Sequence, residues 1–577
     1  MQILTNQMGY VSGDYKKAVF QGTDAVQAGD FQVFDKQKHV VYEGESKFVG
    51  AVAHWNTGTY WTMDFTALKT PGMYTIGLNT SEGMQYSFPF EITEYFQDMR
   101  MLNAVSYYFK AQRDTGEWKE ADSHLKFEGS REGEVCVPGG WMDATGDYGI
   151  HMSHLSYSQV CNPQQAGFSA YVFFKAVENL LQSQNREYSM LIRRMLDEGT
   201  YGADYIMRMR APSGTFYRSK GRRNALAATS ENRRLALEGP MSREKGPVED
   251  KYYEIGMRAG GGTCFAALAA AARHPYPGTE FYPQDYLMAA KEAFAYLWDN
   301  NEMYCGDGAW NLVDEYCALL AASELYASSH EYDYLDKAEI LAKRMLGRMV
   351  PTGGACAWFT SRPGEMFCHA ADEGLPVVAL LTFAKLEPSP SIRKEVLTAV
   401  EKAFNHVLAV TDKVNNPFGY ARYYHSLPDG GQTDKFFFYH TSPAAPWWQG
   451  DNARISSLAA AAWMAAPYVS TEMAERLGRF ATDQLNWIMG LNPFDACMIE
   501  GYGRNNIQYF FQNRYDFMNC PGGICNGITS RMDDEDGILF VTEPTAEVND
   551  NWRWAEQWLP HGTWYIYALS QKQVRSR

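Results

Sequence analysis

The sequence lacks any long apolar segment. No run of apolar residues approaches the roughly 20 that span a bilayer as a helix. The first ten residues, MQILTNQMGY, contain neither the basic region nor the apolar region of a signal peptide. A removed leader would leave no trace, but the sequence as it stands leads us to expect a cytoplasmic protein that has no membrane partner.

An excess of basic charge is also missing. There are 52 Lys and Arg against 68 Asp and Glu, which gives a formal net charge of -16. This balance repels nucleic acid and is compatible with a neutral or cationic substrate. The 10 cysteines form no regular framework, so we expect reduced thiols, most of them buried. The spacing of Cys520 and Cys525 in CPGGIC is not typical of a zinc site.

Several catalytic motifs are absent. The chain has no Gly-rich phosphate loop after a strand, no nucleophile elbow and no HExxH, which argues against nucleotide chemistry, serine hydrolysis and zinc proteolysis. Aromatic residues, in contrast, are abundant, with 15 Trp and 37 Tyr among 577 residues. Their rings serve either as core or as platforms for the faces of sugars.

The first 95 residues have the pattern of a small β-sandwich. Short segments alternate apolar and polar residues and are separated by turn-forming stretches such as KTPG and NTSEG. The expected strands are AVFQG, DFQVFD, YWTMDF, GMYTIGL and QYSFPFEI. Their number and spacing predict an all-β domain of immunoglobulin size over residues 1–95.

Residues 96–577 have a helical period instead. Twelve segments carry apolar residues at i, i+3 and i+4. They lie near 97–114, 166–184, 190–209, 263–273, 284–300, 313–329, 334–349, 375–387, 391–412, 453–469, 473–490 and 561–571. Several pairs are joined by a few residues, whereas the long joins around 115–165, 210–262, 413–452 and 491–560 all fall between pairs. Because short joins force antiparallel neighbours, this alternation predicts an all-α (α/α)₆ barrel whose long loops share one end.

Two acidic clusters lie in these long loops. The stretch PGGWMDATGDYGIHMSHL at 138–155 contains Asp143 and Asp147, and TEPTAEVNDNW at 542–552 contains Glu543, Glu547 and Asp550. The alternation of helices would bring both clusters to the same end of the barrel. Glycoside hydrolysis needs two carboxyl groups on opposite sides of the scissile bond. An N-cap turn or a calcium loop would also explain the first cluster, and the helix dipole would explain the second.

Other polar and aromatic residues in the same loops are candidates for binding sugar. Tryptophan rings stack on sugar faces, and amide, acid and guanidinium groups bond hydroxyls. The candidates are Trp141, His440, Trp447, Trp448, Asp451, Asn452 and Arg504. Each of these candidate residues would also be explained as part of the core or as the start of a helix. His151 and His154 in HMSH lack a clear third ligand and are interpreted as structural. We expect no cofactor or catalytic metal, with a structural calcium ion as an open possibility.

Together these segments resemble glycoside hydrolase family 9, in the group with an N-terminal immunoglobulin-like domain. NQMGY (6–10), GGWMDATGD, YGADYIMRM (201–209), DEYCALLAASELY (314–326), MGLNPF (489–494), EGYGRN (500–505) and AEVNDNW are similar to family segments in the family order. The resemblance implies an inverting hydrolase in which Asp147 is the general base, Asp143 helps to hold the attacking water and Glu547 is the general acid. A general acid must be protonated, so Glu547 should lie in partly apolar surroundings that raise its pKa.

The chain also departs from the family pattern. Its two aspartates are separated by three residues rather than two, and the family's His-His-Arg segment has no match after EGYGRN. The Asp-Ala-Thr-Gly-Asp turn resembles that of cytosolic exo-β-D-glucosaminidases in the family, which release glucosamine from short chitin-derived saccharides. The alternatives are a β-1,4-glucanase or β-glucosidase acting on cello-oligosaccharides, and a non-catalytic carbohydrate-binding protein. The sequence leaves the oligomeric state open.

Overall fold

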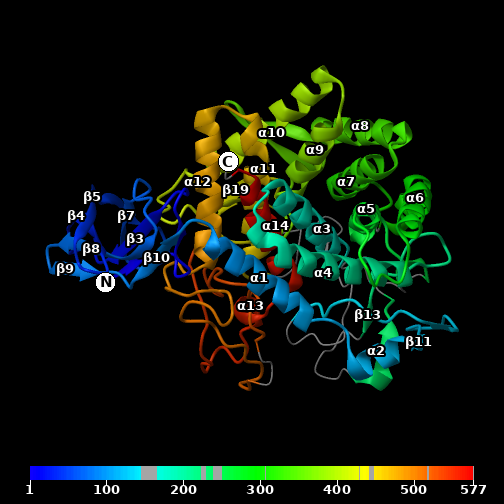
Figure 1. The fold of residues 1–577 in the computed structure, drawn as a ribbon, viewed down its shortest axis with the longest axis horizontal. Helices are drawn as coiled ribbons and strands as arrows, with labels where there is room; N and C mark the ends of the chain where they lie inside the picture. The colour runs from blue at the N-terminus through cyan, green and yellow to red at the C-terminus, as the bar shows by residue number, and fades with distance from the viewer. Residues whose placement is uncertain are drawn as a thin grey trace.

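The protein consists of a β-domain packed against the side of a helical barrel (Figure 1). The structure is a computed structural model. It describes residues 1–144, 166–221, 229–237, 250–305, 307–427, 429–440, 448–515 and 519–575. Among these residues, no helix combines the length and the apolar character that a bilayer crossing requires. The last strand of the β-domain ends at Thr93, and the first helix begins at Phe96.

The N-terminal domain is a sandwich of two mainly antiparallel sheets. One sheet has the order β1-β3-β7-β6, and the other has the order β2-β10-β8-β4-β5, with β9 paired to β8. The strands are β1 (Gln2–Leu4), β2 (Tyr10–Val11), β3 (Lys17–Gly22), β4 (Ala28–Asp35), β5 (Val40–Glu45), β6 (Lys47–Ala51), β7 (Thr59–Asp64), β8 (Gly72–Thr80), β9 (Gly83–Tyr86) and β10 (Phe90–Thr93). The inward-facing residues of both sheets form a separate apolar core.

The predicted strands are present, with one correction. The stretch QYSFPFEI does not form one strand, because residues 87–89 leave the ladder and separate β9 from β10. Pro89 has no N–H to donate, so it fits poorly inside a sheet. The strands β1, β2, β5 and β6 were not predicted. They are short or largely exposed, so their sequences carry little of the alternation that marks a half-buried strand.

Six helices form the inner ring of the barrel. They pack side by side in the order α3, α5, α7, α9, α11, α14 and back to α3, which closes the ring. Their bounds are α3 (Ala166–Gln182), α5 (Gly262–Arg273), α7 (Leu312–Ser329), α9 (Leu375–Leu386), α11 (Asn452–Ala465) and α14 (Leu559–Arg575). Most residues of α5, α7 and α11 are buried on all sides. A helix that is apolar around its whole circumference belongs in the centre of a large domain.

Six further helices cover the ring from outside, each against one inner helix. They are α1 (Phe96–Ala111), α4 (Ser189–Arg208), α6 (Pro283–Asn300), α8 (Tyr332–Gly347), α10 (Pro390–Thr411) and α12 (Thr471–Ile488). In α4, for example, one face is buried and the other is polar. The (α/α)₆ barrel is therefore confirmed, and all twelve helices lie close to their predicted positions.

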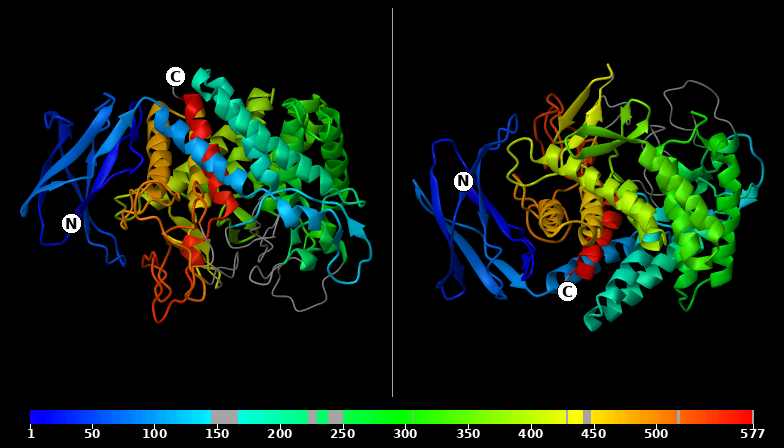
Figure 2. Two further views of the ribbon diagram at one scale, coloured as in Figure 1. Left: turned by 60° about the horizontal axis from the view of Figure 1, so that its bottom comes forward. Right: turned by 90° about the horizontal axis from the view of Figure 1, so that it is seen from above.

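The long connections gather at one end of the barrel (Figure 2, left). They contain short elements that the helical period does not reveal. These are α2 (Gly116–Asp122), β11 (Leu125–Lys126), β12 (Glu134–Val135), β13 (Lys220–Gly221), β14 (Arg234–Leu235), β15 (Met349–Gly353), β16 (Cys356–Arg362), β17 (Glu365–Met366), β18 (Tyr423–Ser426), β19 (Gln432–Lys435) and α13 (Trp552–Ala555). The inner helices all begin at this loop-bearing end.

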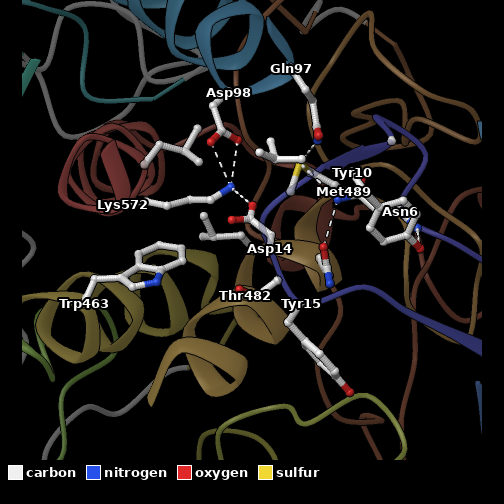
Figure 3. A pocket seen from close by; sticks show the side chains of 15 residues that line it. Asn6, Tyr10, Asp14, Tyr15, Gln97, Asp98, Trp463, Thr482, Met489 and Lys572 are labelled. Atoms are coloured by element: carbon white, nitrogen blue, oxygen red, sulfur yellow. Dashed lines mark hydrogen bonds and ion pairs between the residues drawn. The ribbon is translucent and has the colours of Figure 1, made fainter. Parts of the chain in front are cut away.

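The two domains share polar and apolar contacts. Lys572, near the end of α14, lies between Asp14 of the β-domain and Asp98 of α1, and its ammonium is 2.8 Å from Asp98 Oδ2 (Figure 3). Beside them is a cavity of about 20 Å³, enough for one water molecule. Lys572 is 13 residues beyond Leu559, about 20 Å along α14 from the loop-bearing end. This cavity therefore belongs to the domain interface.

Acid should destabilise the fold through its buried histidines. His406 in α10 stacks on Trp358, 5.3 Å between ring centroids, and burial lowers its pKa from 6.5 to about 4. Because the folded protein binds this proton less tightly than the unfolded chain, the contribution of His406 is complete above about pH 6.5 and is lost as the pH falls toward 4. We expect His406→Asn to weaken the fall in Tm between pH 7 and pH 5, measured by calorimetry. An unchanged slope would contradict this assignment.

Candidate active site

Two glycines shape the first acidic segment. Gly139 and Gly140 adopt φ values of 102° and 84°, a left-handed region that other residues rarely occupy. A Cβ atom on Gly140 would lie 2.7 Å from the ring of Tyr205 in α4. The segment can therefore lie directly against α4, and Lys220 donates hydrogen bonds to the carbonyl of Gly139 at 2.8 Å. The Gly-Gly pair places the following residues at the loop-bearing end of the barrel.

Trp141 is part of the core and not of a sugar-binding surface. Its side chain is 1% exposed, and its ring packs against Phe109 and Phe173. Its indole N–H donates to Glu198 Oε1 at 2.7 Å. The predicted stacking of Trp141 on substrate is therefore wrong. The ring instead fixes the Gly-Gly turn, and with it Asp143, to α4.

Asp143 is joined to the last part of the chain. The backbone N–H of Leu559 donates to the Asp143 carbonyl at 3.1 Å, and Ala144 forms an isolated antiparallel bridge with Trp558. The Asp143 side chain is 1% exposed. The described part of the first acidic segment thus lies beside residues that follow the second acidic segment. Asp147, which completes the predicted pair, lies outside the described residues, as do His151 and His154.

The segment that carries Glu547 is held by its own turn and by a buried asparagine. The Thr545 hydroxyl accepts from the N–H groups of Glu547 at 3.3 Å and Val548 at 3.0 Å. Asn551 is fully buried and donates from its amide to the carbonyls of Gln508 and Val541. The Glu547 side chain itself is exposed. The partly apolar surroundings predicted for this carboxyl are therefore missing in this structure.

His440 and Trp448 form a stacked pair. Their ring centroids are 4.0 Å apart, with an angle of 13° between the ring planes. His440 Nε2 lies 2.7 Å from the Ser530 hydroxyl, and Nδ1 lies 3.7 Å from Glu535. Burial, with a smaller effect of Arg553, lowers the pKa of His440 to about 4, so the ring is neutral near pH 7. Because His440 covers one face of Trp448, which is 8% exposed, that face cannot stack on a sugar. Trp447 lies outside the described residues.

Asp451 and Asn452 serve the framework of the barrel. Asp451 is 3% exposed, accepts a hydrogen bond from Tyr420 and forms an ion pair with Arg454 at 3.4 Å. Asn452, 2% exposed, donates to the carbonyl of Cys525 at 2.8 Å and so joins the start of α11 to a distant loop. The prediction that these two side chains contact substrate is wrong for this structure, because neither one reaches the surface.

Arg504 is directed at the N-terminal domain. Its guanidinium forms two hydrogen bonds to Asp495, both 2.6 Å, and lies 4.1 Å from the ring centroid of Phe88. Its backbone N–H donates to the side chain of Gln7 at 2.7 Å. The predicted contact of Arg504 with sugar is therefore corrected to a contact between the two domains. The Nε and Nη2 atoms of Arg504 thus both donate to the carboxylate of Asp495.

The sequence interpretation missed two residues of α13. The Arg553 guanidinium lies 4.9 Å from the ring centroid of Trp448 and 4.5 Å from that of Trp552. Within the described parts of the chain, the buried Nε of Arg553 has no hydrogen-bond partner, and burial lowers the pKa of the guanidinium against the opposing effect of Asp550. A cation between two indole rings, a few residues after Glu547, is well placed to donate hydrogen bonds to a ligand. The Trp-Arg-Trp run at 552–554, next to an acidic cluster, was the available signal.

The described residues do not group three or more potential metal ligands in one place. This part of the chain includes nine cysteines, and none of them forms a disulfide bond with another described cysteine. Cys520 and Cys525, the pair considered for zinc, are among them, and burial raises the pKa of both thiols. A structural calcium ion remains a prediction.

Comparison with protein families identifies the chain. The model of "Glycosyl hydrolase family 9" matches residues 99–520, and that of "Cellulase N-terminal ig-like domain" matches residues 1–82. The chain therefore belongs to glycoside hydrolase family 9 and is a glycoside hydrolase with an N-terminal immunoglobulin-like domain. The family match ends before the segment that contains Glu547.

The relatives of this chain are distant. A xyloglucan-specific endo-β-1,4-glucanase of Bacteroides ovatus, BoGH9A, is 24% identical over 366 residues, which cover 57% of this chain and 55% of that protein. The chain thus aligns with little more than half of the length of that relative. The structure of a Bacteroides ovatus GH9 protein has a TM-score of 0.67 at 18% identity and covers 100% of this chain and 99% of that one. An endoglucanase from Alicyclobacillus acidocaldarius gives a TM-score of 0.64 at 18% identity, with 100% and 99% covered. At this identity the structures establish the shared fold.

Proposed function

We propose that the protein is an inverting hydrolase of β-1,4 linkages in which Asp147 is the general base, Asp143 helps to hold the attacking water and Glu547 is the general acid. The observation that carries this proposal is the backbone contact between Asp143 and Leu559. It joins the first acidic segment to the start of α14, a few residues beyond the second acidic segment, which supports a common place for the two segments at one end of the barrel. An inverting mechanism needs a carboxyl group on either side of the scissile bond, about 6.5–9.5 Å apart, with room for water.

The exposure of Glu547 adds a condition to this mechanism. A general acid has to be protonated at working pH, and a carboxyl group in water is not. We therefore propose that the bound saccharide itself covers Glu547 and displaces water from it. The ring of Trp552, five residues further along the chain and only partly buried, supplies an apolar surface for the same purpose. The partly apolar surroundings that a general acid needs would then form on binding.

For the substrate, we propose a short saccharide with glucosamine at its non-reducing end. The net charge of -16 and the carboxylates of the site favour an ammonium group, since an ammonium paired with a carboxylate is a strong directional contact. The Asp-Ala-Thr-Gly-Asp turn and the missing His-His-Arg segment separate the chain from cellulase-like family members. The ten cysteines form no regular disulfide framework in the sequence, which suits a reducing compartment, so we propose that the protein meets imported oligosaccharides in the cytoplasm.

A β-1,4-glucanase is the second candidate. The names of BoGH9A and of the Alicyclobacillus protein describe them as endoglucanases, and the first is described as specific for xyloglucan. Endo action requires an open groove that binds sugars on both sides of the cleaved bond, whereas exo action requires a closed end. Rates on defined substrates distinguish the two modes of action.

Initial rates on a panel of saccharides test the substrate. We expect kcat/KM on the glucosamine disaccharide, and on its form with N-acetylglucosamine at the reducing end, to exceed that on cellobiose by about 100-fold or more. A polar site built around an amine leaves its groups unpaired when the amine is replaced by a hydroxyl. NMR of the first product should show the α anomer. Preference for cellobiose, or a rapid fall in the viscosity of soluble cellulose or xyloglucan, would contradict the glucosaminidase proposal and favour the glucanase.

A further inference from the structure

One residue of the N-terminal domain is inserted into the core of the barrel. Trp55 lies in the connection between β6 and β7 and is 2% exposed. Its neighbours His54 and Asn56 both have positive φ values, 67° and 51°, so the backbone on either side of Trp55 turns sharply. The ring belongs to the same apolar cluster as the inner helices, rather than to the core of its own domain. The domain thus presents this side chain outward, to its partner.

The contacts of Trp55 are directed at one loop of the barrel. Its ring centroid is 4.7 Å from that of Phe436 and 6.1 Å from that of Phe437, and the latter ring is nearly parallel, at 22°. Phe418 and Trp487 complete the surroundings at 6.3 Å and 6.1 Å. Phe436 and Phe437 directly follow strand β19 and precede His440 by four and three residues, respectively. Trp55 therefore packs against the segment that leads to His440.

The neighbouring loop, residues 530–536, is held from the same side. His54 Nδ1 lies 3.2 Å from Asp534 Oδ2, so the residue next to Trp55 contacts this loop directly. Lys435, the last residue of β19, bonds Asp536 at 2.8 Å and ties the two loops together. The Ser530 hydroxyl, at the start of the 530–536 loop, is the 2.7 Å partner of His440. Both loops that position the His440 ring are thus anchored to the N-terminal domain.

From His440 the contacts continue into the candidate active site. Its ring stacks on Trp448, and Trp448 lies beside Arg553, which follows Glu547 by six residues. The backbone of Gly450 donates to the carbonyl of Arg553 at 2.9 Å, which holds this part of the loop against α13. The contacts thus run from Trp55 to Arg553, six residues beyond the proposed general acid.

We propose that Trp55 is a positioning residue, by which the N-terminal domain sets the place of the His440–Trp448–Arg553 stack in the active site. The inference rests on the proposed catalytic function, because it assigns the stack to that site. When catalysis depends on well-oriented groups, a mutation far from the chemistry that misplaces them by about 1 Å lowers the rate by up to about 100-fold. The Trp55 indole N–H has no hydrogen-bond partner in the described parts of the chain. The flat apolar ring, and not its polar atom, is therefore the feature that acts.

Three variants test the proposal. We expect Trp55→Ala to lower kcat/KM by about 10- to 100-fold, mainly through kcat, because the void lets residues 436–440 shift. Trp55→Phe keeps an aromatic ring and should restore activity to within about threefold. The matched control is the double variant Lys17→Gln with Asp483→Asn, which neutralises a buried ion pair of 2.8 Å in the same domain interface. It should keep wild-type kcat/KM even where its Tm falls as much as that of Trp55→Ala.

A spectroscopic readout separates this inference from the proposed function. In protein with labelled histidine, the His440 ring protons should carry a large ring-current shift from Trp448, assigned through His440→Asn. We expect Trp55→Ala to reduce that shift and the control variant to preserve it. A His440 signal that does not respond to Trp55→Ala, or equal losses of activity in Trp55→Ala and the control, would overturn the positioning role. If the wild-type protein hydrolysed no glycoside but Trp55→Ala still reduced the ring-current shift of His440, the proposed function would be refuted. The coupling between Trp55 and the His440 ring would remain.

Discussion

Replacing Glu547 with Gln is expected to lower kcat on the preferred saccharide by about 10²- to 10⁴-fold. The amide has the shape of the protonated acid but cannot release a proton to the leaving oxygen, and proton transfer by a positioned group contributes about this much to a rate. Binding of substrate should remain within a few fold of wild type, measured by calorimetry on the inactive variant. A non-catalytic carbohydrate-binding protein would bind its ligand in both forms and turn over in neither.

Glu543→Gln is the matched control for this variant. Glu543 is four residues away in the same segment and is also exposed, so the two substitutions differ only in which carboxyl is removed. We expect Glu543→Gln to keep kcat within about threefold of wild type. If Glu543→Gln were the inactive variant and Glu547→Gln were active, the roles of the two acids would have to be exchanged.

Replacing Arg454 with Met is expected to destabilise the protein by about 3–5 kcal/mol. Arg454 is 1% exposed, forms ion pairs with Glu373 and Asp451, and lies 3.3 Å from the ring centroid of Tyr423. Its removal leaves two buried carboxyl groups without their cation. Both acids already have raised pKa values because of burial, with Glu373 at about 7. Urea unfolding at pH 8, where both groups are ionised in the unfolded chain, should show the effect fully.

Glu373→Gln provides the comparison. The amide oxygen can still accept from Arg454, and one buried negative charge is removed, so we expect a change of less than about 1 kcal/mol. The two variants together show whether the cluster of Arg454, Glu373 and Asp451 stabilises the barrel or binds saccharide. If Arg454→Met kept wild-type stability but lost affinity for saccharide, Asp451 and Arg454 would belong to the substrate site, as the sequence suggested for Asp451.

The misplaced residues share one cause. Trp141, Asp451 and Arg504 lie in loops and Asn452 begins α11, in the part of the barrel where sugar-binding residues are also expected. Long loops of this size have their own interior, however, and their polar side chains pair with one another and with the helices below. Whether an arginine in such a loop faces a sugar or an aspartate depends on neighbours that come from elsewhere in the chain. No local pattern carries that information.

The sequence by itself determined the fold class and the twelve barrel helices, and it predicts that both acidic clusters lie at the loop-bearing end of the barrel. Periodicity and connection length are local properties, and they are sufficient because a short join forces two helices to be antiparallel. Only the tertiary structure decided which loop residues are buried, and that the N-terminal domain inserts Trp55 beside the loop that leads to His440. It also decided that Arg553 lies beside Trp448 and that Arg504 lies beside Phe88 of the N-terminal domain. Burial and charge pairing depend on contacts between residues hundreds of positions apart, which exist only once the helices have packed into the barrel.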